Sequence, residues 1–128
     1  MKLLLDTHTL LWWLFDDPQL SESVRKAVAT ADNRILVSSA SAWELATKYR
    51  IGKLPEAGNI VEKLPHYLRK ERFEVLPISL EHALKAGLLP GPHRDPFDRM
   101  LMAQSEIEKI PVATIDPVFT QYGVRVVW

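Results

Sequence analysis

The chain of 128 residues lacks cysteine, and it lacks any long apolar segment. Without cysteine, disulfide scaffolds, thiolate zinc sites and cysteine nucleophiles are all excluded. The longest apolar run, Leu10–Phe15, is six residues, whereas a membrane-spanning helix needs about 20. The first residues reach the carboxylate of Asp6 too early for the apolar stretch of a signal peptide. These absences favour a soluble, cytoplasmic protein with no membrane partner.

The chain also lacks an excess of charge of either sign, because 16 lysines and arginines balance 16 aspartates and glutamates. This balance excludes a basic tail or a strongly basic surface for nucleic acid. A protein of this composition that handles nucleic acid therefore has to use a local site. Apolar residues make up 47% of the sequence and charged residues 25%, which is typical of a folded chain. The length predicts one domain over residues 1–128.

Short apolar segments alternate with longer helical ones along the sequence. The predicted strands are residues 2–5, 35–37, 74–78, 111–115 and 124–128. The predicted helices are residues 10–15, 21–31, 38–50, 59–70 (with a break at Pro65), 80–88 and 97–108. Residues 89–96 contain three prolines and one glycine and predict a loop. Continuously apolar strands that alternate with helices indicate an α/β fold with a parallel sheet covered on both faces.

Four acidic residues stand next to strands or near the start of helices in this pattern: Asp6, Glu44, Asp98 and Asp116. In a parallel α/β sheet, the carboxyl ends of strands and the amino ends of helices share one edge. Open sheets place their sites at this edge, where the strand order reverses. If the first strand is central and the fourth lies beside it, the four carboxylates meet there. Gathered carboxylates repel one another, and a hard dication such as Mg²⁺ or Mn²⁺ is their natural partner.

Each acid also has a purely structural interpretation. Asp6, Asp95 and Asp116 are placed to cap helices, and the last two precede a proline that suits the first helical position. Asp98, three residues after Asp95, favours the same helix end electrostatically. The segment Ser41–Glu44 has the spacing of a capping box, which predicts a bond from Glu44 to a backbone N–H. Only the predicted gathering of the acids on one edge favours a functional site.

Neighbouring polar residues are open to two interpretations. Thr7 and Thr114 can orient a water or a carboxylate, or satisfy local backbone groups. Arg99 can meet a phosphate, or be a solvated surface residue. His8 and His93 are interpreted as bystanders, because a metal mechanism needs no histidine acid or base.

Two further groups are equally open. The basic run Lys48, Arg50 and Lys53 can follow an RNA backbone or form a solvated face, and Lys48 is spaced for a helix-surface pair with Glu44. Trp12 and Trp13 point about 100° apart on a helix, which predicts either a partner contact or a thick core.

At these residues the sequence resembles the PIN-domain family of metal-dependent ribonucleases, and within it the VapC-type toxins of toxin–antitoxin pairs. The matching segments are LLLDTH (3–8), SSASAWEL (38–45), HRDPFDRMLMAQ (93–104) and ATID (113–116). The family's four acids fall, in chain order, on Asp6, Glu44, Asp98 and Asp116. Its hydroxyl residue near the fourth acid falls on Thr114, and Asp95 is an additional acid of this branch.

This resemblance implies a three-layer α/β/α sandwich with a mostly parallel sheet of four to five strands. It implies that Asp6, Glu44, Asp98 and Asp116 bind one or two divalent ions, Mg²⁺ or Mn²⁺, directly or through water. A metal-activated water would then hydrolyse RNA phosphodiester bonds. The expected partners are the RNA substrate, a second copy of the chain in a homodimer, and a VapB-type antitoxin.

Other functions stay open. A catalytically silent PIN-like module would bind RNA or protein, although the presence of all four acids argues against it. An aspartyl phosphatase is suggested by a strand followed by Asp6-Thr7-His8-Thr9, but that superfamily normally has a second Asp at the position of His8. A flap-type DNA nuclease shares the fold plan but is normally much larger. Metal-dependent RNA cleavage would identify the ribonuclease, and a trapped acyl-phosphate the phosphatase.

Overall fold

A five-stranded sheet forms the centre of the structure, a computed structural model that describes residues 1–128. The strand order is β3-β2-β1-β4-β5, and every neighbouring pair is parallel. The strands are β1 (Lys2–Leu5), β2 (Arg34–Ser38), β3 (Glu74–Leu76), β4 (Val112–Ala113) and β5 (Val126–Val127). The predicted α/β class and parallel sheet are confirmed.

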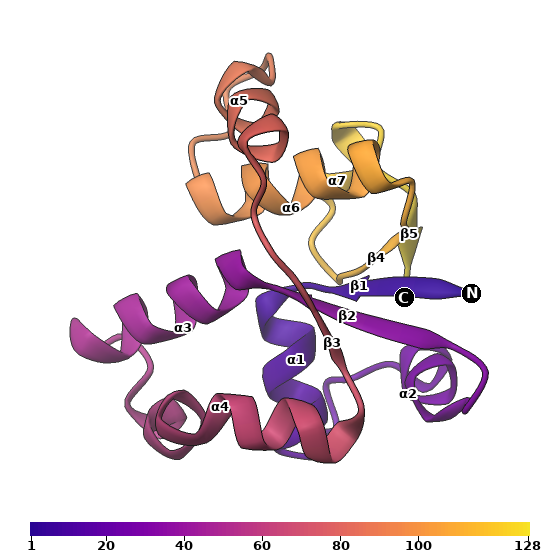
Figure 1. Cartoon of the computed structure of the whole chain (residues 1–128), viewed down its shortest axis with the longest axis vertical. Coiled ribbons are helices and arrows are strands. Elements are labelled where there is room, and N and C mark those ends of the chain that lie inside the picture. Colours follow the sequence, from indigo (N-terminus) through magenta and orange to yellow (C-terminus); the bar gives the residue numbers. More distant parts are fainter.

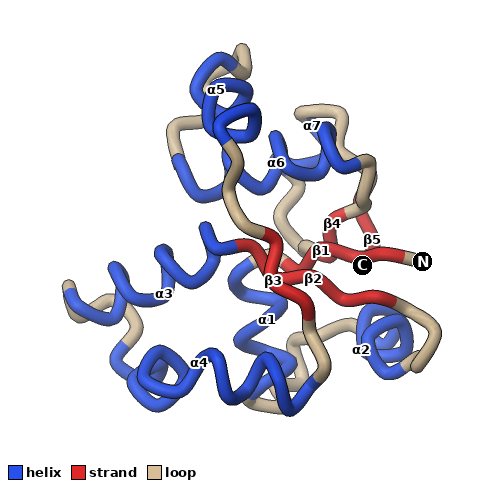
Figure 2. The backbone as a smooth tube through the Cα atoms, viewed as in Figure 1, coloured by secondary structure: helices blue, strands red, loops and turns tan.

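Helices cover both faces of this sheet, which gives three layers (Figures 1 and 2). One face carries α1 (Thr7–Leu14), α2 (Glu22–Ala29), α3 (Ser39–Arg50), the 3₁₀ turn η1 (Pro55–Ala57) and α4 (Gly58–Glu71). The other carries α5 (Leu80–Leu88), α6 (Pro96–Glu108) and α7 (Val118–Gln121). None of these helices has the length and apolar character that crossing a membrane requires.

Two apolar cores, one on each face, hold the layers together. Side chains alternate along a strand, so Leu3 and Leu5 of β1 enter the 16-residue core beneath α1, α2 and α4. Leu4 between them enters the 8-residue core on the opposite face, with Leu101 and Met102 of α6. Because β1 is buried on both faces, its continuous run of leucines is the pattern expected of a central parallel strand.

Several predicted element boundaries differ from the observed ones. The first helix begins at Thr7 rather than at Leu10, because the Asp6 carboxylate accepts a hydrogen bond from the Thr9 backbone N–H and starts it directly after β1. Helix α4 continues past Pro65 but is kinked at Lys63, where φ is −118°. The sequence patterns did not predict η1 or α7, which are only one turn long.

The two adjacent tryptophans of α1 both pack within the chain. The rings of Trp12 and Trp128 have their centroids 5.8 Å apart, and those of Trp13 and Phe73 are 6.3 Å apart. Both tryptophans are half-buried against the larger core. Of the two interpretations offered by the sequence, these contacts support the thick core.

Candidate active site

The four acids predicted from the sequence surround one hollow at the carboxyl edge of the sheet. The strand order reverses between β1 and β4, so that Asp6 after β1 and Asp116 after β4 flank the reversal. Helices α3 and α6 bring Glu44 and Asp98 to the same place. The hollow has a volume of about 400 Å³. Its lining residues are Asp6, Thr7, His8, Trp12, Glu44, Lys48, Asp95, Asp98, Ile115, Asp116 and Pro117.

Asp6 follows β1, the middle strand of the sheet, and is 7% exposed. Its Oδ1 accepts a hydrogen bond of 2.8 Å from the backbone N–H of Thr9, so the predicted capping role is real. Burial raises the pKa of Asp6, and hydrogen bonds from Thr114 and Thr9 offset only part of that rise. The residue therefore caps α1 and also faces the hollow as a carboxylate that is costly to ionise without a cation.

Glu44 is 4% exposed, and side chains hold both of its carboxylate oxygens. The Thr7 hydroxyl donates to Oε1 at 2.6 Å, and Nζ of Lys48 lies 2.5 Å from Oε2. The predicted capping box is wrong, because α3 already begins at Ser39 with the Ser38 hydroxyl as its cap. Glu44 consequently lies in the second turn, where its carboxylate turns to the hollow rather than to a backbone N–H.

Asp98 lies in the first turn of α6, three residues after Asp95, the residue that caps this helix. The carboxylate of Asp95 accepts hydrogen bonds from the N–H groups of Phe97 and Asp98, at 2.9 and 3.1 Å, which confirms its capping role. Burial raises the pKa of Asp98 to about 6, and the charges of Asp95 and Glu44 add to the rise.

His93 is a contact of Asp98 that the sequence interpretation missed. Its Nε2 lies 2.9 Å from Oδ2 of Asp98, so this histidine contacts one of the four acids. The hydrogen bond from His93 lowers the pKa of Asp98 and so offsets part of the effect of burial. The loop composition of residues 89–96 carried no signal for this contact, which depends on how the loop folds back over α6.

Asp116 and Thr114 follow β4 as a connected pair. The backbone N–H of Asp116 donates to the Thr114 hydroxyl at 3.0 Å, and the Asp116 carboxylate accepts from the N–H of Val118, also at 3.0 Å. Thr114 is 1% exposed, and its hydroxyl also helps to lower the pKa of Asp6. Thr114 therefore acts on a backbone group of the fourth acid and on the carboxylate of the first. The sequence had left these two roles, toward backbone groups and toward a carboxylate, as alternatives.

The sequence matches the PIN domain family over residues 3–124. The chain belongs to the PIN-domain family. It is 42% identical over 59 residues to Ribonuclease VapC16 of Mycobacterium tuberculosis (strain ATCC 25618 / H37Rv), a match that spans 46% of this chain and 40% of that relative. The chain thus spans less than half of the length of this curated relative.

Solved structures share the fold of this PIN domain across almost its whole length. VapBC2 from Rickettsia felis, bound to a DNA fragment from its promoter, superposes with a TM-score of 0.72 at 18% identity, covering 99% of this chain and 98% of that one. FitAcB from Neisseria gonorrhoeae has a TM-score of 0.67 at 22% identity, covering 97% and 95%. The expected PIN fold is confirmed.

Arg99 of the PIN domain makes contacts that neither interpretation of the sequence included. Its three side-chain nitrogens donate to backbone carbonyls of the preceding loop and of α5: Nε to Ala86 at 3.0 Å, Nη1 to His93 at 2.9 Å, and Nη2 to Leu89. These bonds engage all three side-chain nitrogens and leave one N–H on each Nη atom. Arg99 fixes the loop that carries His93 and Asp95 to the hollow.

The same loop is held from its other side by Tyr122. The Tyr122 hydroxyl accepts a hydrogen bond of 3.0 Å from the backbone N–H of His93. Gly91 lies against this ring with a φ of 100°, and a Cβ added there would clash with the tyrosine hydroxyl. The close approach therefore requires glycine, both for its backbone angle and for its lack of a side chain.

The donor set of this hollow suits a hard dication, because every acidic group offers carboxylate oxygen. As placed, no three acidic or histidine side chains lie close enough together to hold one ion. Protein partners occupy the carboxylates instead: the Thr9 N–H for Asp6, Lys48 for Glu44, and His93 for Asp98. Binding one ion through three of these side chains would therefore require some of them to shift.

Proposed function

We propose that this PIN domain is a divalent-metal-dependent endoribonuclease, the toxin of a VapBC-type toxin–antitoxin pair that acts on RNA in the cytoplasm. The observation that carries the proposal is the single hollow at the β1–β4 reversal, to which four segments distant in sequence each contribute a carboxylate. The family membership and the name of the mycobacterial relative support the same activity. We assign this ribonuclease activity to one domain over residues 1–128.

In this proposal, Asp6, Glu44, Asp98 and Asp116 would hold Mg²⁺ or Mn²⁺. The ion would lower the pKa of a bound water and neutralise the phosphate of the RNA backbone. Neighbouring residues keep the carboxylates oriented: the Thr7 hydroxyl donates to Glu44, and the Thr9 backbone N–H donates to Asp6. The raised pKa values of Asp6 and Asp98 are consistent with carboxylates that are short of positive charge.

The partners in this proposal are a second copy of the chain and a VapB-type antitoxin. Helix α5 exposes an apolar stripe of Leu80, Leu84 and Leu88, which are 78%, 59% and 81% exposed and spaced by four residues on one face. Such a stripe is costly in water, and we assign it to the homodimer contact. The Rickettsia neighbour is the VapBC2 complex and the Neisseria neighbour is FitAcB, and their likeness to this chain supports a VapB-type antitoxin as its partner.

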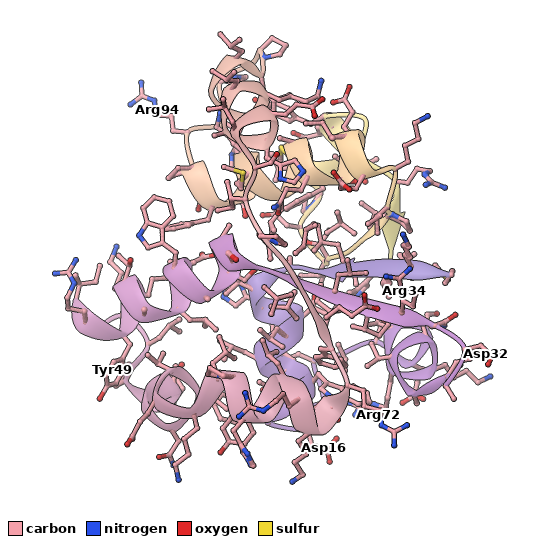
Figure 3. All side chains as sticks on the ribbon, viewed as in Figure 1. Asp16, Asp32, Arg34, Tyr49, Arg72 and Arg94 are labelled. Atoms are coloured by element: carbon pink, nitrogen blue, oxygen red, sulfur yellow. The ribbon has the colours of Figure 1, made fainter.

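The activity is tested by incubating the purified protein with a structured RNA in Mg²⁺, in Mn²⁺ and in EDTA. We expect cuts within the RNA in the presence of either ion and none in EDTA. Asp116→Asn should lose this cleavage, whereas the matched variant Asp32→Asn should keep it, because Asp32 lies at the opposite end of the sheet (Figure 3). Cleavage that continues in EDTA, or that survives Asp116→Asn, would contradict the proposal.

The homodimer is tested separately, by measuring the molar mass in solution. Leu84→Glu places a charge in the middle of the leucine stripe and should convert a dimer into a monomer. The control is Val75→Glu, because Val75 is a similarly exposed apolar residue (56%) outside the stripe. A dimer that persists in Leu84→Glu would assign the contact to another surface.

A further inference from the structure

Lys48 is the only lysine or arginine that lines the acidic hollow. Its Nζ lies 2.5 Å from Oε2 of Glu44, one helical turn back along α3. The side chain of Glu44 is 5% exposed and that of Lys48 27%, so the ion pair is part of the wall of the hollow. An ordinary surface pair of this chain, Lys85 with Glu106, is longer at 3.2 Å, and its side chains are 34% and 61% exposed.

The Lys48 ammonium faces several acids, not only its partner. Burial works against its charged form, but the hydrogen bond and the charge of Glu44, together with the charges of Asp95 and Asp98, outweigh burial and raise the pKa of Lys48. Carboxylates from α3 and α6 therefore share this one cation. In the protein without a bound ion, Lys48 supplies the positive charge that a buried Glu44 needs.

A divalent ion in the same hollow would need the same carboxylate. The Oε2 atom of Glu44 is bonded to the ammonium, and Oε1 is bonded to Thr7. A dication placed a few ångströms from the ammonium would also be repelled by it, and this repulsion is strong where water is scarce. The two cations therefore oppose each other both for the ligand atom and through their charges. Lysine suits such an exchange, because its flexible stem can move the charge away from the acid.

We propose that Lys48 is a positioning residue that occupies Glu44 in the metal-free PIN domain and competes with the divalent ion for it. This inference rests on the proposed function insofar as an ion binds at the four acids. The inference goes beyond that function in one respect: the Lys48 ammonium acts as a counter-ion within the hollow and so sets the metal concentration at which the site fills.

The experiment measures Mn²⁺ binding by calorimetry, in the absence of RNA. We expect Lys48→Met to bind Mn²⁺ about tenfold more tightly than the wild type, because one nearby positive charge is gone. Lys48→Arg keeps the charge and should bind Mn²⁺ like the wild type. Lys85→Met removes a lysine of the exposed pair on α5 and α6 and should also leave the affinity unchanged.

A second measurement is thermal unfolding in EDTA and in Mn²⁺. Without metal, Lys48→Met should unfold at a lower temperature than the wild type, because Glu44 is left buried without a cation. Mn²⁺ should raise its melting temperature by more than it raises that of the wild type. Lys48→Gln, which can still donate a hydrogen bond to Glu44, provides a second uncharged variant if Lys48→Met does not fold.

Two results would overturn the competition. One is an Mn²⁺ affinity of the uncharged variants that is equal to or weaker than that of the wild type, and the other is the absence of Mn²⁺ binding in all variants. A failure of the proposed function has a different signature, since RNA would stay intact while Mn²⁺ binding still responded to the charge at position 48.

Discussion

The two edges of the sheet both carry ionised side chains, but their carboxylates respond in opposite ways. At the amino edge, Arg34 of β2 donates two hydrogen bonds of 2.8 and 2.7 Å to Glu74 of β3, and these bonds lower the pKa of Glu74. At the carboxyl edge, burial raises the pKa of Asp6 and that of Asp98. Figure 3 shows Arg34 and Arg94 on opposite sides of the molecule, with Arg94 on the loop beside the hollow.

The difference between the edges comes from partners and from water. Glu74 has one matched, exposed cation of its own, so its charge is satisfied in the folded chain. In the hollow, Lys48 is the only lysine or arginine for the acids Glu44, Asp95 and Asp98, and Asp98 is also bonded to His93. The carboxylate at the amino edge is therefore matched by a positive charge, whereas the hollow at the carboxyl edge has fewer positive charges than carboxylates. An excess of buried carboxylates over positive charges is a physical sign of a site for a cationic ligand.

The largest expected effect follows from removing one acid of the hollow. Asp6→Asn should reduce metal-dependent RNA cleavage by about 100-fold or more, because a ligand of the ion is lost. In EDTA the same variant should melt at a higher temperature than the wild type, since the amide can still cap α1 and carries no buried charge. The control at the other edge is Glu74→Gln, which should leave cleavage unchanged. Full cleavage by Asp6→Asn would remove the functional difference between the edges.

The second largest effect is expected at Arg99, whose replacement should cost more stability than that of Arg34 at the amino edge. Arg99→Gln removes donors from three backbone carbonyls and should lower the free energy of unfolding by about 2–3 kcal/mol, measured in urea. Arg99→Lys should not restore it, because one ammonium cannot span three acceptors. Cleavage should fall as well, since the loop positions His93 and Asp95. A loss of stability no larger than that of Arg34→Gln would contradict this role.

A smaller effect distinguishes the edges by pH. Asp98 has a pKa of about 6 in the folded chain against an ordinary value of 3.8, so the folded state binds more protons than the unfolded state between these values. Stability in EDTA should therefore fall as the pH rises from about 4 to about 6 through this group. The stability advantage of Asp98→Asn over the wild type should be largest above pH 6 and absent below about pH 4. An advantage independent of pH would show that desolvation of this carboxylate is not its cause.

The smallest effect is expected at the amino edge. Arg34→Gln breaks an exposed pair, and we expect the melting temperature to change by no more than about 2 °C, with the change shrinking at high salt. Cleavage should be unchanged. Because Arg34 lowers the pKa of Glu74, the small contribution of the pair should be present at neutral pH and lost as the pH falls through the folded pKa of Glu74. A large loss of stability at neutral pH would show that the Arg34–Glu74 pair contributes more to folding than an exposed pair normally does.

Most of the fold and the acids of the hollow were predictable from the sequence, because their signals are local. A leucine run followed at once by Asp6 predicts a buried strand with an acid at its end, and β1 is that strand. The alternation of strands and helices then places strand ends on one edge whatever the loops do. Elements of a single turn, such as α7, gave too short a pattern to be recognised.

The errors arose where two local partners competed for one group. The spacing Ser41–Glu44 is that of a capping box, yet the hydroxyl of Ser38 caps α3 first and Glu44 bonds to Thr7, 37 residues away. The contacts of Arg99 and His93 were not predictable for a different reason, since they depend on the path of the loop over α6.

By itself, the sequence determined which residues are buried in strands, the α/β order of the elements, and the identity of the four acids, because these depend on apolar periodicity and on chain order. The caps made by Asp6 and Asp95 and the Glu44–Lys48 pair within α3 are local contacts that the sequence also indicated, and only the tertiary structure decided the remaining contacts of the acids. That Glu44 also bonds to Thr7 of α1, and that Asp98 bonds to His93 of the preceding loop, depends on the positions of atoms from separate elements. Burial of charge, which raises the pKa values at one edge and not at the other, arises only when those elements pack together.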